Sequence, residues 1–338
     1  MRHVNIPVFI PHLGCPNDCV FCNQKRISGT NSFDIKNTDN IIKNALSTVD
    51  KNNAECEVAF FGGSFTGIDR DDMIYLLETA HKYVRTGDIT SIRLSTRPDY
   101  IDEEILSILK KYGVKTIELG LQSLDDGVLR VTKRGHSADC AIKACKMIKN
   151  AGFTLIGQMM IGLPKSDLQK EIYTAKTIAE LCDGARVYPT VVLRETELCD
   201  MAKNRTYTPL CLDDAIMRTG EVLLVFDEYN KPVIRIGLQS GDELYDPEVV
   251  YGGDYHPAIG ELAESYVYYK KILEELNKQN DDLTGKALTV FCAKGHTSKV
   301  IGQKKMNKLK VIDKFNIKSV KVVEKIDIIG YNIILDIQ

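Results

Sequence analysis

Short apolar runs alternate with longer amphipathic stretches through the first 200 residues of the chain. The runs have the length and flanking turn residues of buried strands, and the stretches between them have the 3.6-residue period of helices. Asp102 is a suitable N-cap, and Gly113 and Gly152 follow two helix ends. Strands are predicted at residues 4–10, 57–61, 91–95, 116–121, 154–161 and 184–192, and helices at 39–50, 71–84, 102–111, 138–150 and 167–181.

Strands separated by helices of this length predict a parallel sheet, because a long crossover must connect neighbouring parallel strands. Six βα units fit before residue 200, so we predict an α/β fold of the partial (β/α)6 TIM-type barrel class. Functional groups of such barrels gather at the carboxyl ends of the strands, where Gly62-Gly63-Ser64 and Gly162-Leu163-Pro164 lie. A doubly wound sheet is the alternative architecture, although no Gly-x-Gly-x-x-Gly follows the first strand.

The pattern changes after residue 240. A polar, turn-rich passage over residues 241–257 precedes one strong helix at 259–276. A strand at 287–292, a lysine-rich helix at 298–315 and two strands at 320–324 and 330–336 follow. We therefore predict two domains: residues 1–240 form the α/β core, and residues 241–338 form a small α+β module that docks on it.

Charge is distributed unevenly along the 338 residues, although the formal net charge is −2. Residues 286–325 contain eleven lysines and only two acids, which favours contact with a polyanion such as RNA; a solvated amphipathic helix is the alternative. The chain has no apolar run long enough to cross a membrane and no signal peptide, so we expect a cytoplasmic protein without membrane contact. The candidate RNA contacts are Lys294, Lys299, Lys304, Lys305, Lys308 and Lys310.

Three of the ten cysteines are clustered. Three residues separate Cys15 from Cys19, and two residues separate Cys19 from Cys22. Thiolates favour soft metals and iron–sulfur clusters, and three thiolates on a four-iron cluster leave one iron open for an external ligand. A structural zinc site completed by His12 or Cys56 is the alternative. The scattered cysteines are expected to be small buried apolar side chains.

The triad after the first strand, followed in order by the motifs at later strand ends, resembles the signature of the radical S-adenosylmethionine (SAM) superfamily. The resemblance covers about the first 200 residues. It implies that Cys15, Cys19 and Cys22 hold a [4Fe–4S] cluster whose open iron binds SAM. It also implies reductive cleavage of SAM to a 5′-deoxyadenosyl radical, which abstracts a hydrogen atom, and an electron donor such as ferredoxin or flavodoxin.

The resemblance further implies SAM-binding residues at successive strand ends. Glycine at 62 and 63 would let the backbone approach the methionyl ammonium, and Arg134 would pair with the SAM carboxylate. Phe21 would lie near the adenine. The implied set is Phe21, Gly62, Gly63, Ser64, Thr66, Ser95, Arg97, Gln122, Ser123, Arg134, Met160 and Gly162.

Several segments are similar to the Elp3-like branch of this superfamily. Ser64 stands where the glycine motif usually has an acidic residue, and the segments at 95–99, 118–123, 186–190 and 233–238 resemble that branch. The chain ends at Gln338, without room for the branch's acetyltransferase domain, so acetyl-CoA use is not expected. The cysteine spacing is also shorter than in Elp3. The resemblance is therefore to a short, stand-alone bacterial form.

We expect a radical SAM enzyme that modifies an RNA, either tRNA or rRNA, with the lysine-rich module binding phosphates. Alternatives are a small-molecule or protein substrate, or a non-catalytic zinc or iron–sulfur RNA-binding protein. The stretch from Tyr251 to Leu262 is a candidate lid, or simply a capped turn before the long helix. Candidates for the substrate face are Tyr188, Arg194, Arg235, Tyr255 and His256.

Overall fold

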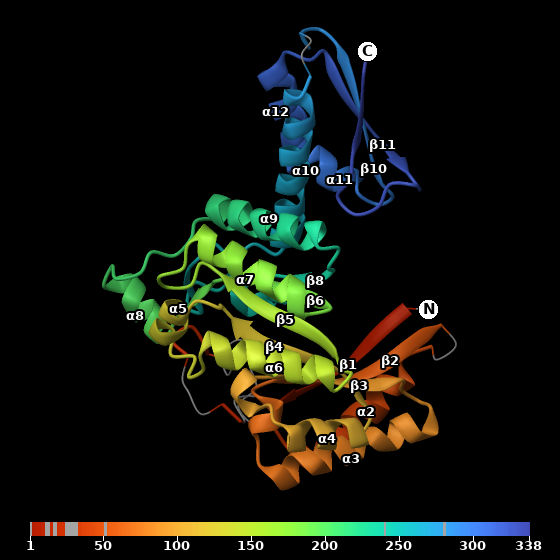
Figure 1. Cartoon of the computed structure of the whole chain (residues 1–338), viewed down its shortest axis with the longest axis vertical. Coiled ribbons are helices and arrows are strands. Elements are labelled where there is room, and N and C mark those ends of the chain that lie inside the picture. The colour runs from red at the N-terminus through yellow and green to blue at the C-terminus, as the bar shows by residue number, and fades with distance from the viewer. Residues whose placement is uncertain are drawn as a thin grey trace.

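The computed structural model describes residues 2–10, 14–15, 19–23, 33–50, 53–239, 241–279 and 282–338. Within these residues seven parallel strands form one curled sheet, an open half-barrel, in the order β1-β2-β3-β4-β5-β6-β8 (Figure 1). The strand order follows the chain without reversal, so the alternative of a doubly wound sheet is wrong. The strands are β1 (Arg2–Ile10), β2 (Ala54–Gly62), β3 (Ser91–Thr96), β4 (Val114–Gln122), β5 (Thr154–Ile161), β6 (Gly184–Pro189) and β8 (Val233–Ile236).

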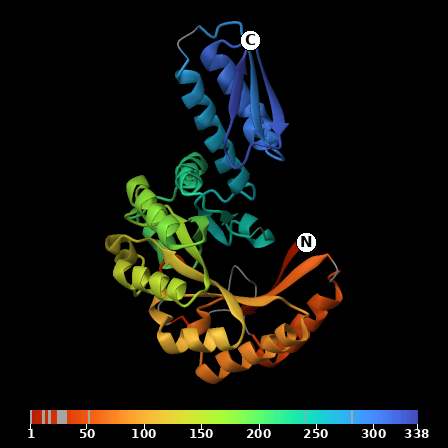
Figure 2. The same cartoon turned by 45° about the vertical axis from the view of Figure 1, so that its right-hand side comes forward.

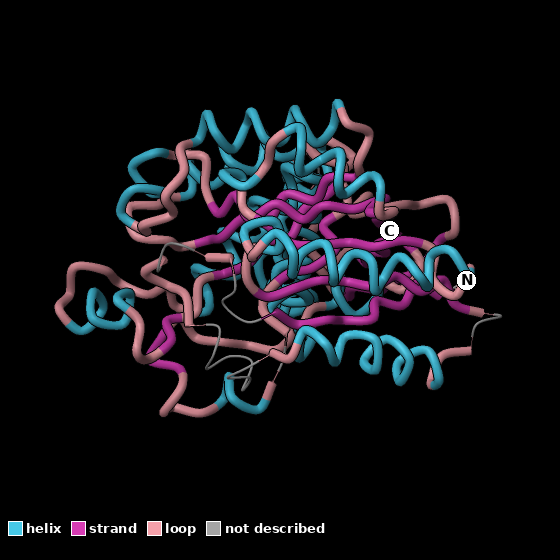
Figure 3. Tube along the Cα trace, turned by 90° about the horizontal axis from the view of Figure 1, so that it is seen from below, coloured by secondary structure: helices cyan, strands magenta, loops and turns pink. Residues whose placement is uncertain are grey.

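Helices cover the convex face of the sheet and leave its concave face open (Figures 2 and 3). Along β4, Ile117 and Leu119 pack in the core beneath the helices, so the alternate residues Glu118 and Gly120 face the concave side. The predicted N-cap Asp102 is confirmed, since its carboxylate accepts the Ile105 N–H at 2.7 Å. The helices are α2 (Thr38–Ser47), α3 (Arg70–Thr86), α4 (Glu103–Lys111), α6 (Ala138–Asn150), α7 (Leu168–Leu181) and α9 (Leu212–Glu228), with α5 (Asp126–Val131) and α8 (Glu197–Lys203) in the loops after β4 and β6. Single 3₁₀ turns are η1 (Ile35–Asn37), η2 (Phe65–Gly67), η3 (Pro98–Tyr100), η4 (Asp242–Tyr245) and η5 (Gln303–Lys305).

The strand predicted at residues 184–192 is too long. It ends at Pro189, and β7 (Val192–Leu193) then pairs antiparallel with β9 (Val250–Gly252) in a separate sheet. Gly253 has a φ of +87°, and a Cβ at this position would lie 2.5 Å from the Thr190 carbonyl oxygen. The chain therefore turns at Thr190 because a returning segment packs directly on its backbone.

The C-terminal module lies at one end of the long axis of the molecule (Figure 1). It follows α10 (Ile259–Asn277), which packs against α9 and leads to β10 (Ala287–Ala293), α11 (Thr297–Ile301), α12 (Met306–Phe315), β11 (Ser319–Lys325) and β12 (Ile334–Ile337). The central β10 pairs parallel with β11 and antiparallel with β12. Tyr268 and Ile272 of α10 share an apolar core with Val290 and Cys292 of β10.

The single helix predicted at residues 298–315 is wrong, because the chain breaks between α11 and α12. Gly302, Lys304 and Lys305 have φ values of +78°, +52° and +63°, which an α-helix cannot contain. Gly302 also approaches Asn307 so closely that a Cβ would lie 3.0 Å from it. The buried Asn307 amide donates to the Ser265 carbonyl at 2.8 Å and fixes the start of α12.

Candidate active site

The loop that carries the cysteine triad lies against the turn that follows β2. Gly14 has a φ of +73°, and a Cβ there would lie 2.2 Å from the Ser64 carbonyl oxygen. A Cβ on Gly67 would lie 2.5 Å from the Gly14 carbonyl oxygen. The Gly63 N–H donates to the Ile10 carbonyl at 2.7 Å. The two segments thus meet through backbone alone, at a distance that only glycine permits.

Gly62 extends this contact at the end of β2. It has a φ of +115°, and a Cβ at this position would lie 2.4 Å from the Ile10 carbonyl oxygen. The glycine pair predicted to approach SAM therefore also joins the carboxyl ends of β1 and β2. The three nearest atoms to that Cβ position are all backbone atoms of Ile10, so the close approach of the two backbones requires glycine.

The far side of the cysteine loop is held by the loops after β4 and β6. The Val20 N–H donates to the Thr132 carbonyl at 3.2 Å, and the Val20 carbonyl accepts the Leu198 N–H at 2.8 Å. Val20 and Leu198 belong to a small apolar cluster, and the half-buried Phe21 packs against it. The triad is therefore positioned from both sides of the barrel mouth.

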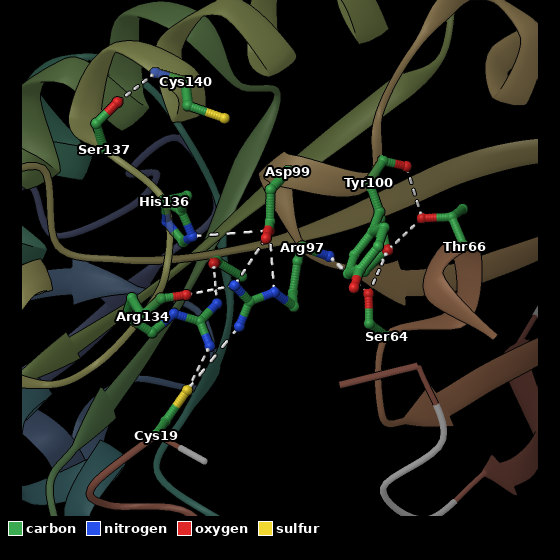
Figure 4. A network of polar contacts seen from close by, with 12 residues as sticks. Cys19, Ser64, Thr66, Arg97, Asp99, Tyr100, Arg134, His136, Ser137 and Cys140 are labelled. Atoms are coloured by element: carbon green, nitrogen blue, oxygen red, sulfur yellow. Dashed lines mark hydrogen bonds and ion pairs between the residues drawn. The ribbon is translucent and has the colours of Figure 1, made fainter. Parts of the chain in front are cut away.

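Cys19 is buried and lies beside two guanidinium groups (Figure 4). Its Sγ is 3.3 Å from Arg134 Nη1 and 4.0 Å from Arg97 Nη1. Both arginines are buried, and Arg97 Nη2 donates to the Arg134 carbonyl. Cys15 is exposed and Cys22 is half-buried. Two buried cations thus lie where anionic sulfur ligands are predicted, which offsets the cost of burying negative charge.

Asp99 neutralises one of these two arginines. Its carboxylate accepts hydrogen bonds from Arg97 Nε and Nη2, both at 2.9 Å, and although burial opposes ionisation this pairing lowers the pKa of Asp99. His136 Nδ1 lies 3.9 Å from Asp99, and burial together with Arg134 lowers the pKa of His136 to about 4. Arg134 Nε is buried and has no hydrogen-bond partner in the described part of the chain. Arg134 therefore has an N–H group left to donate to an anionic ligand.

Ser64 and Thr66 tie the turn after β2 to the turn after β3. Ser64 Oγ is 3.0 Å from Thr96 Oγ1 and accepts the Arg97 N–H at 3.3 Å. Thr66 Oγ1 is 2.5 Å from Thr96 Oγ1 and donates to the Tyr100 carbonyl at 2.9 Å. Both side chains are buried, so they hold Arg97 in place; direct contact with SAM stays a prediction.

Gln122 ends β4 in a left-handed conformation that non-glycine residues seldom adopt, with a φ of +67°. Its amide pairs reciprocally with Gln158 of β5, with N···O distances of 3.1 and 2.9 Å. Gly120 leaves room for these groups, since a Cβ would lie 3.1 Å from Gln122 Nε2 and 3.3 Å from Arg134 Nη2. Ser123, also buried, uses its hydroxyl to accept a backbone N–H two residues ahead. Strained backbone of this kind gathers at functional sites.

The Gly162 turn after β5 is held by three side chains that the sequence analysis missed. Gly162 has a φ of +81°; its N–H donates to Glu171 Oε1 and its carbonyl accepts the Tyr207 hydroxyl, both at 2.7 Å. Arg218 Nε lies 2.8 Å from Glu171 Oε2. Burial raises the pKa of Glu171 despite this arginine. Helices α7 and α9 and the loop between β7 and α9 thus fix the segment predicted to contact the ribose and adenine.

A row of charged side chains crosses the concave face, and its pairing was not predicted. Arg93 Nε is 2.6 Å from Glu57 Oε2, and Arg93 Nη1 is 3.0 Å from Glu118 Oε1. Arg186 Nη2 is 2.8 Å from the same Glu118 oxygen, and Arg186 Nη1 donates to the Tyr188 hydroxyl at 3.1 Å. Burial raises the pKa of Glu118, which outweighs the attraction of the two arginines. Glu57, Arg93, Glu118 and Arg186 are called the lumen ion row below.

The remaining predicted residues lie around this row. Ser95 on β3 and Met160 on β5 are half-buried, at concave-facing positions of their strands. Tyr188 joins the row through Arg186. Arg235 of β8 pairs in register with Arg186, so the two arginines occupy neighbouring strands.

Arg194 and His256 have local structural contacts. Arg194 Nε donates to the Pro247 carbonyl at 2.6 Å, and its guanidinium lies 5.6 Å from the centre of the Tyr251 ring. His256 Nδ1 accepts the Ala258 N–H at 3.1 Å, just before α10 begins. These contacts agree with the capped-turn interpretation of this segment, and a substrate role for either residue stays a prediction.

The candidate RNA-binding lysines lie on the C-terminal module. Lys304 and Lys305 are exposed on the break between α11 and α12, and neither forms an ion pair with any described residue. Lys299 differs, because its Nζ lies 2.8 Å from Glu264. Lys310 is exposed and lies 5.6 Å from the centre of the Tyr269 ring; Lys294 is exposed and Lys308 half-buried.

The residues present fit an iron–sulfur cluster with a carboxylate-bearing ligand better than a zinc ion. Cys56 pairs in register with Val4, six residues before the end of β1, which at roughly 3.3 Å per residue is about 20 Å from the strand end that the cysteine loop follows. Cys56 is therefore excluded as a fourth zinc ligand, and His12 lies outside the described residues. In the described ranges, the cysteine triad included, no three His, Cys, Asp or Glu side chains lie close enough together to hold a metal ion. The buried arginines beside Cys19 and the unused Arg134 Nε match an anionic cluster and a carboxylate instead.

Sequence profiles identify the class of protein that this barrel and site define. The profile of the radical SAM superfamily matches residues 9–176, and that of the radical SAM C-terminal domain matches residues 182–269. The chain belongs to the radical SAM superfamily and is a radical SAM enzyme, whose cofactors are a [4Fe–4S] cluster and SAM. The second match spans residue 240, and the domain boundary predicted there stays a prediction.

Within the superfamily the chain belongs to the Elp3-like branch. It is 26% identical over 228 residues to Elongator complex protein 3 of Dictyostelium discoideum, a match that covers 61% of this chain and 41% of that protein. It is 34% identical over 148 residues to the tRNA uridine(34) acetyltransferase of Methanocaldococcus infernus, covering 41% of this chain and 27% of that protein. The chain thus spans less than half the length of these relatives.

The solved structure of the archaeal Methanocaldococcus infernus Elp3 has the same fold. It superposes with a TM-score of 0.61 at 21% identity, covering 82% of this chain and 64% of that one. The predicted partial TIM-type barrel is confirmed. Over the described residues no helix is both long and apolar enough to span a membrane.

Proposed function

We propose that this radical SAM enzyme modifies an RNA, and that Cys15, Cys19 and Cys22 ligate its cluster. The observation that supports the ligand assignment is the surroundings of the triad. Gly14 contacts the turn after β2 on one side, and two buried guanidinium groups lie beside Cys19 on the other. Held by these three cysteines, the cluster would supply the electron for reductive cleavage of SAM and so the radical chemistry of hydrogen abstraction from the substrate. We further propose ferredoxin or flavodoxin as the electron donor.

The chain's own residues then bind and orient SAM. Arg134 offers its unused Nε to the SAM carboxylate, while Asp99 keeps the neighbouring Arg97 neutralised. The methionyl ammonium binds at the Gly62–Gly63 turn, where the absence of side chains on the two glycines lets a ligand come close to the backbone. Glu171 and Tyr207 hold the Gly162 turn against the ribose and adenine.

Anaerobic reconstitution tests the ligand assignment. The native chain should bind about four irons and form 5′-deoxyadenosine from SAM with dithionite as reductant. A Cys19→Ala variant should lose the cluster's visible absorption and the product. Cys292→Ala is the matched control, because Cys292 is also buried but lies in the core of the C-terminal module. A full iron complement in Cys19→Ala, or one zinc and no product in the native chain, would refute the assignment.

The RNA substrate is proposed from the relatives and from the lysines. One relative's name specifies tRNA uridine 34, and the exposed Lys304 and Lys305 have no ion-pair partner among described residues. Each phosphate contact releases about 0.9 counterions, so the logarithm of the association constant should fall steeply with the logarithm of salt concentration.

Titration of unmodified tRNA at several salt concentrations tests this part. Changing Lys304 and Lys305 together to alanine should flatten the salt slope by about two. Lys299→Ala is the control, because its ammonium is already paired with Glu264. Affinity that does not depend on salt would contradict the phosphate contacts. Cleavage of SAM without any RNA binding would favour a small-molecule or protein substrate.

A further inference from the structure

A lobe at the barrel mouth, residues 191–194 and 243–256, is anchored over the ends of β6 and β8. Leu193, Leu244 and Val249 form its apolar core, against which Leu238 and Tyr255 pack. The Gly253 backbone rests on Thr190, and β7 pairs with β9 inside the lobe. Backbone hydrogen bonds and this core hold the side chains of the lobe in defined positions. The residues of this mouth lobe belong neither to the cysteine site nor to the lumen ion row.

Arg235 brings an uncompensated cation to the edge of this lobe. It pairs in register with Arg186, whose charge Glu118 balances at 2.8 Å. Among described residues, Arg235 forms no ion pair within 4.0 Å, and its Nε donates only to the Gly237 carbonyl at 3.2 Å. A guanidinium has five N–H donors, so most of this group's capacity is unused. An arginine in this state favours an anion with several acceptor oxygens.

Tyr255 supplies a second unused donor. Its hydroxyl oxygen is buried and has no hydrogen-bond partner among described residues. Burial, and then the neighbouring Tyr245, raise the pKa of Tyr255, while Arg235 is close enough to lower it. The phenol is therefore protonated at neutral pH and has an O–H to donate. A buried hydroxyl without a partner is unfavourable, and a ligand oxygen that accepts its hydrogen bond would remove this cost.

Tyr245 adds an aromatic face beside these donors. Its ring meets the Tyr255 ring edge-on, with centroids 5.4 Å apart and an angle of 82° between the planes. Tyr245 is 58% exposed, more than any other exposed tyrosine in the described part of the chain. An exposed tyrosine held against a second ring is a face on which proteins stack an unpaired base, and Arg235, close enough to affect Tyr255, offers a cation for the phosphate.

We propose that the mouth lobe binds one unstacked nucleotide of the substrate, with its phosphate at Arg235 and Tyr255 and its base on Tyr245. This proposal rests on the RNA substrate proposed above and specifies which part of that RNA enters the barrel mouth. An apolar small molecule would leave the two donors without acceptors, and a peptide carbonyl offers neither the charge nor the several oxygens of a phosphate. A free carboxylate would satisfy the donors but would leave the exposed ring without a stacking partner.

Tryptophan fluorescence tests the site directly, since the chain contains no tryptophan. Tyr245→Trp introduces a single reporter that keeps the stacking face. Uridine 5′-monophosphate should quench it saturably, whereas ribose 5-phosphate should occupy the site without quenching and compete. Adding Arg235→Gln to the Tyr245→Trp chain should raise the Kd for uridine 5′-monophosphate by about tenfold or more. The weaker binding of uridine, which has no phosphate, should not change. Tyr255→Phe should raise the Kd for uridine 5′-monophosphate by a smaller factor.

Tyr173→Trp is the matched control, because Tyr173 is 55% exposed but lies on α7. Equal, non-saturating quenching of both reporters would overturn the site, as would an unchanged Kd in a folded Arg235→Gln chain. The assay needs neither cluster nor turnover. Saturable nucleotide binding with no tRNA binding would therefore show that the lobe site survives while the proposed RNA substrate fails.

Discussion

The contact between the cysteine loop and the turn after β2 predicts a specific defect for Gly14→Ala. A Cβ on residue 14 would lie 2.2 Å from the Ser64 carbonyl oxygen, so the loop must retreat by about 0.8 Å to reach even the 3.0 Å limit. Sites that bind or react need their groups held within about 0.5 Å. We therefore expect reduced iron binding and a rate of 5′-deoxyadenosine formation that is about 100-fold lower, as for other displacements of about 1 Å.

Gly87→Ala is the control for backbone strain. Gly87 has a φ of +77°, nearly that of Gly14, but nothing lies within 4 Å of the Cβ that alanine would add. Both variants carry the cost of about 1–2 kcal/mol for a left-handed alanine, which urea unfolding should report. Only Gly14→Ala carries the overlap with Ser64. Iron per chain and the product rate are measured after anaerobic reconstitution. Values for Gly14→Ala within twofold of those for Gly87→Ala would show that the close contact does not position the triad.

Three further substitutions test contacts described above. Tyr207→Phe should raise the KM for SAM and lower the free energy of unfolding by about 1 kcal/mol, because the Gly162 carbonyl loses its 2.7 Å hydrogen bond; an unchanged KM would remove Tyr207 from the SAM site. His136→Asn should flatten the loss of stability on acidification. In the native chain the pKa of His136 is about 4 in the folded state and 6.5 in the unfolded state, so the unfolded state binds more protons between these values. The free energy of unfolding of the native chain should therefore fall by up to about 3 kcal/mol from pH 6.5 to 4, and that of the variant should lack this loss. Identical pH profiles of native and variant chains would contradict that pKa. Asn307→Ala should lower the free energy of unfolding by about 1–3 kcal/mol, measured in urea, since Ser265 and two further carbonyls lose a buried donor; a neutral effect would mean that water replaces the amide.

The elements that the sequence predicts well are those whose signals are local. Apolar runs identify six of the seven strands of the half-barrel, all but the short β8, and Asp102 marks a helix start by its own chemistry. The cysteine spacing and the glycine pairs at strand ends identify the class of site, because each motif is contiguous in the chain. The comparisons confirm that class, while the roles of the individual site residues stay predictions.

The features that the sequence does not predict depend on register and packing. Arg93 and Glu118 are 25 positions apart and meet only because β3 and β4 pair at one particular offset. The break before α12 depends on Asn307, whose amide reaches the carbonyl of Ser265 on another helix. A lysine-rich stretch with helical periodicity contains no local sign of that contact, so one continuous helix was predicted there.

The lumen ion row explains how the sheet of an open barrel stays stable without an interior filled by apolar side chains. Closed (β/α)8 barrels exclude water by packing layers of branched apolar side chains inside the ring of strands. A half-barrel has one side missing, so an apolar lining would be wetted and would invite aggregation. Here Glu57, Arg93, Glu118 and Arg186 alternate in sign from β2 to β6, and each charge has an opposite neighbour on another strand. Ion pairs between side chains thus connect the strands on the concave face, and they tolerate water. A hydrated polar ligand can enter without disturbing the packing that keeps the strands together.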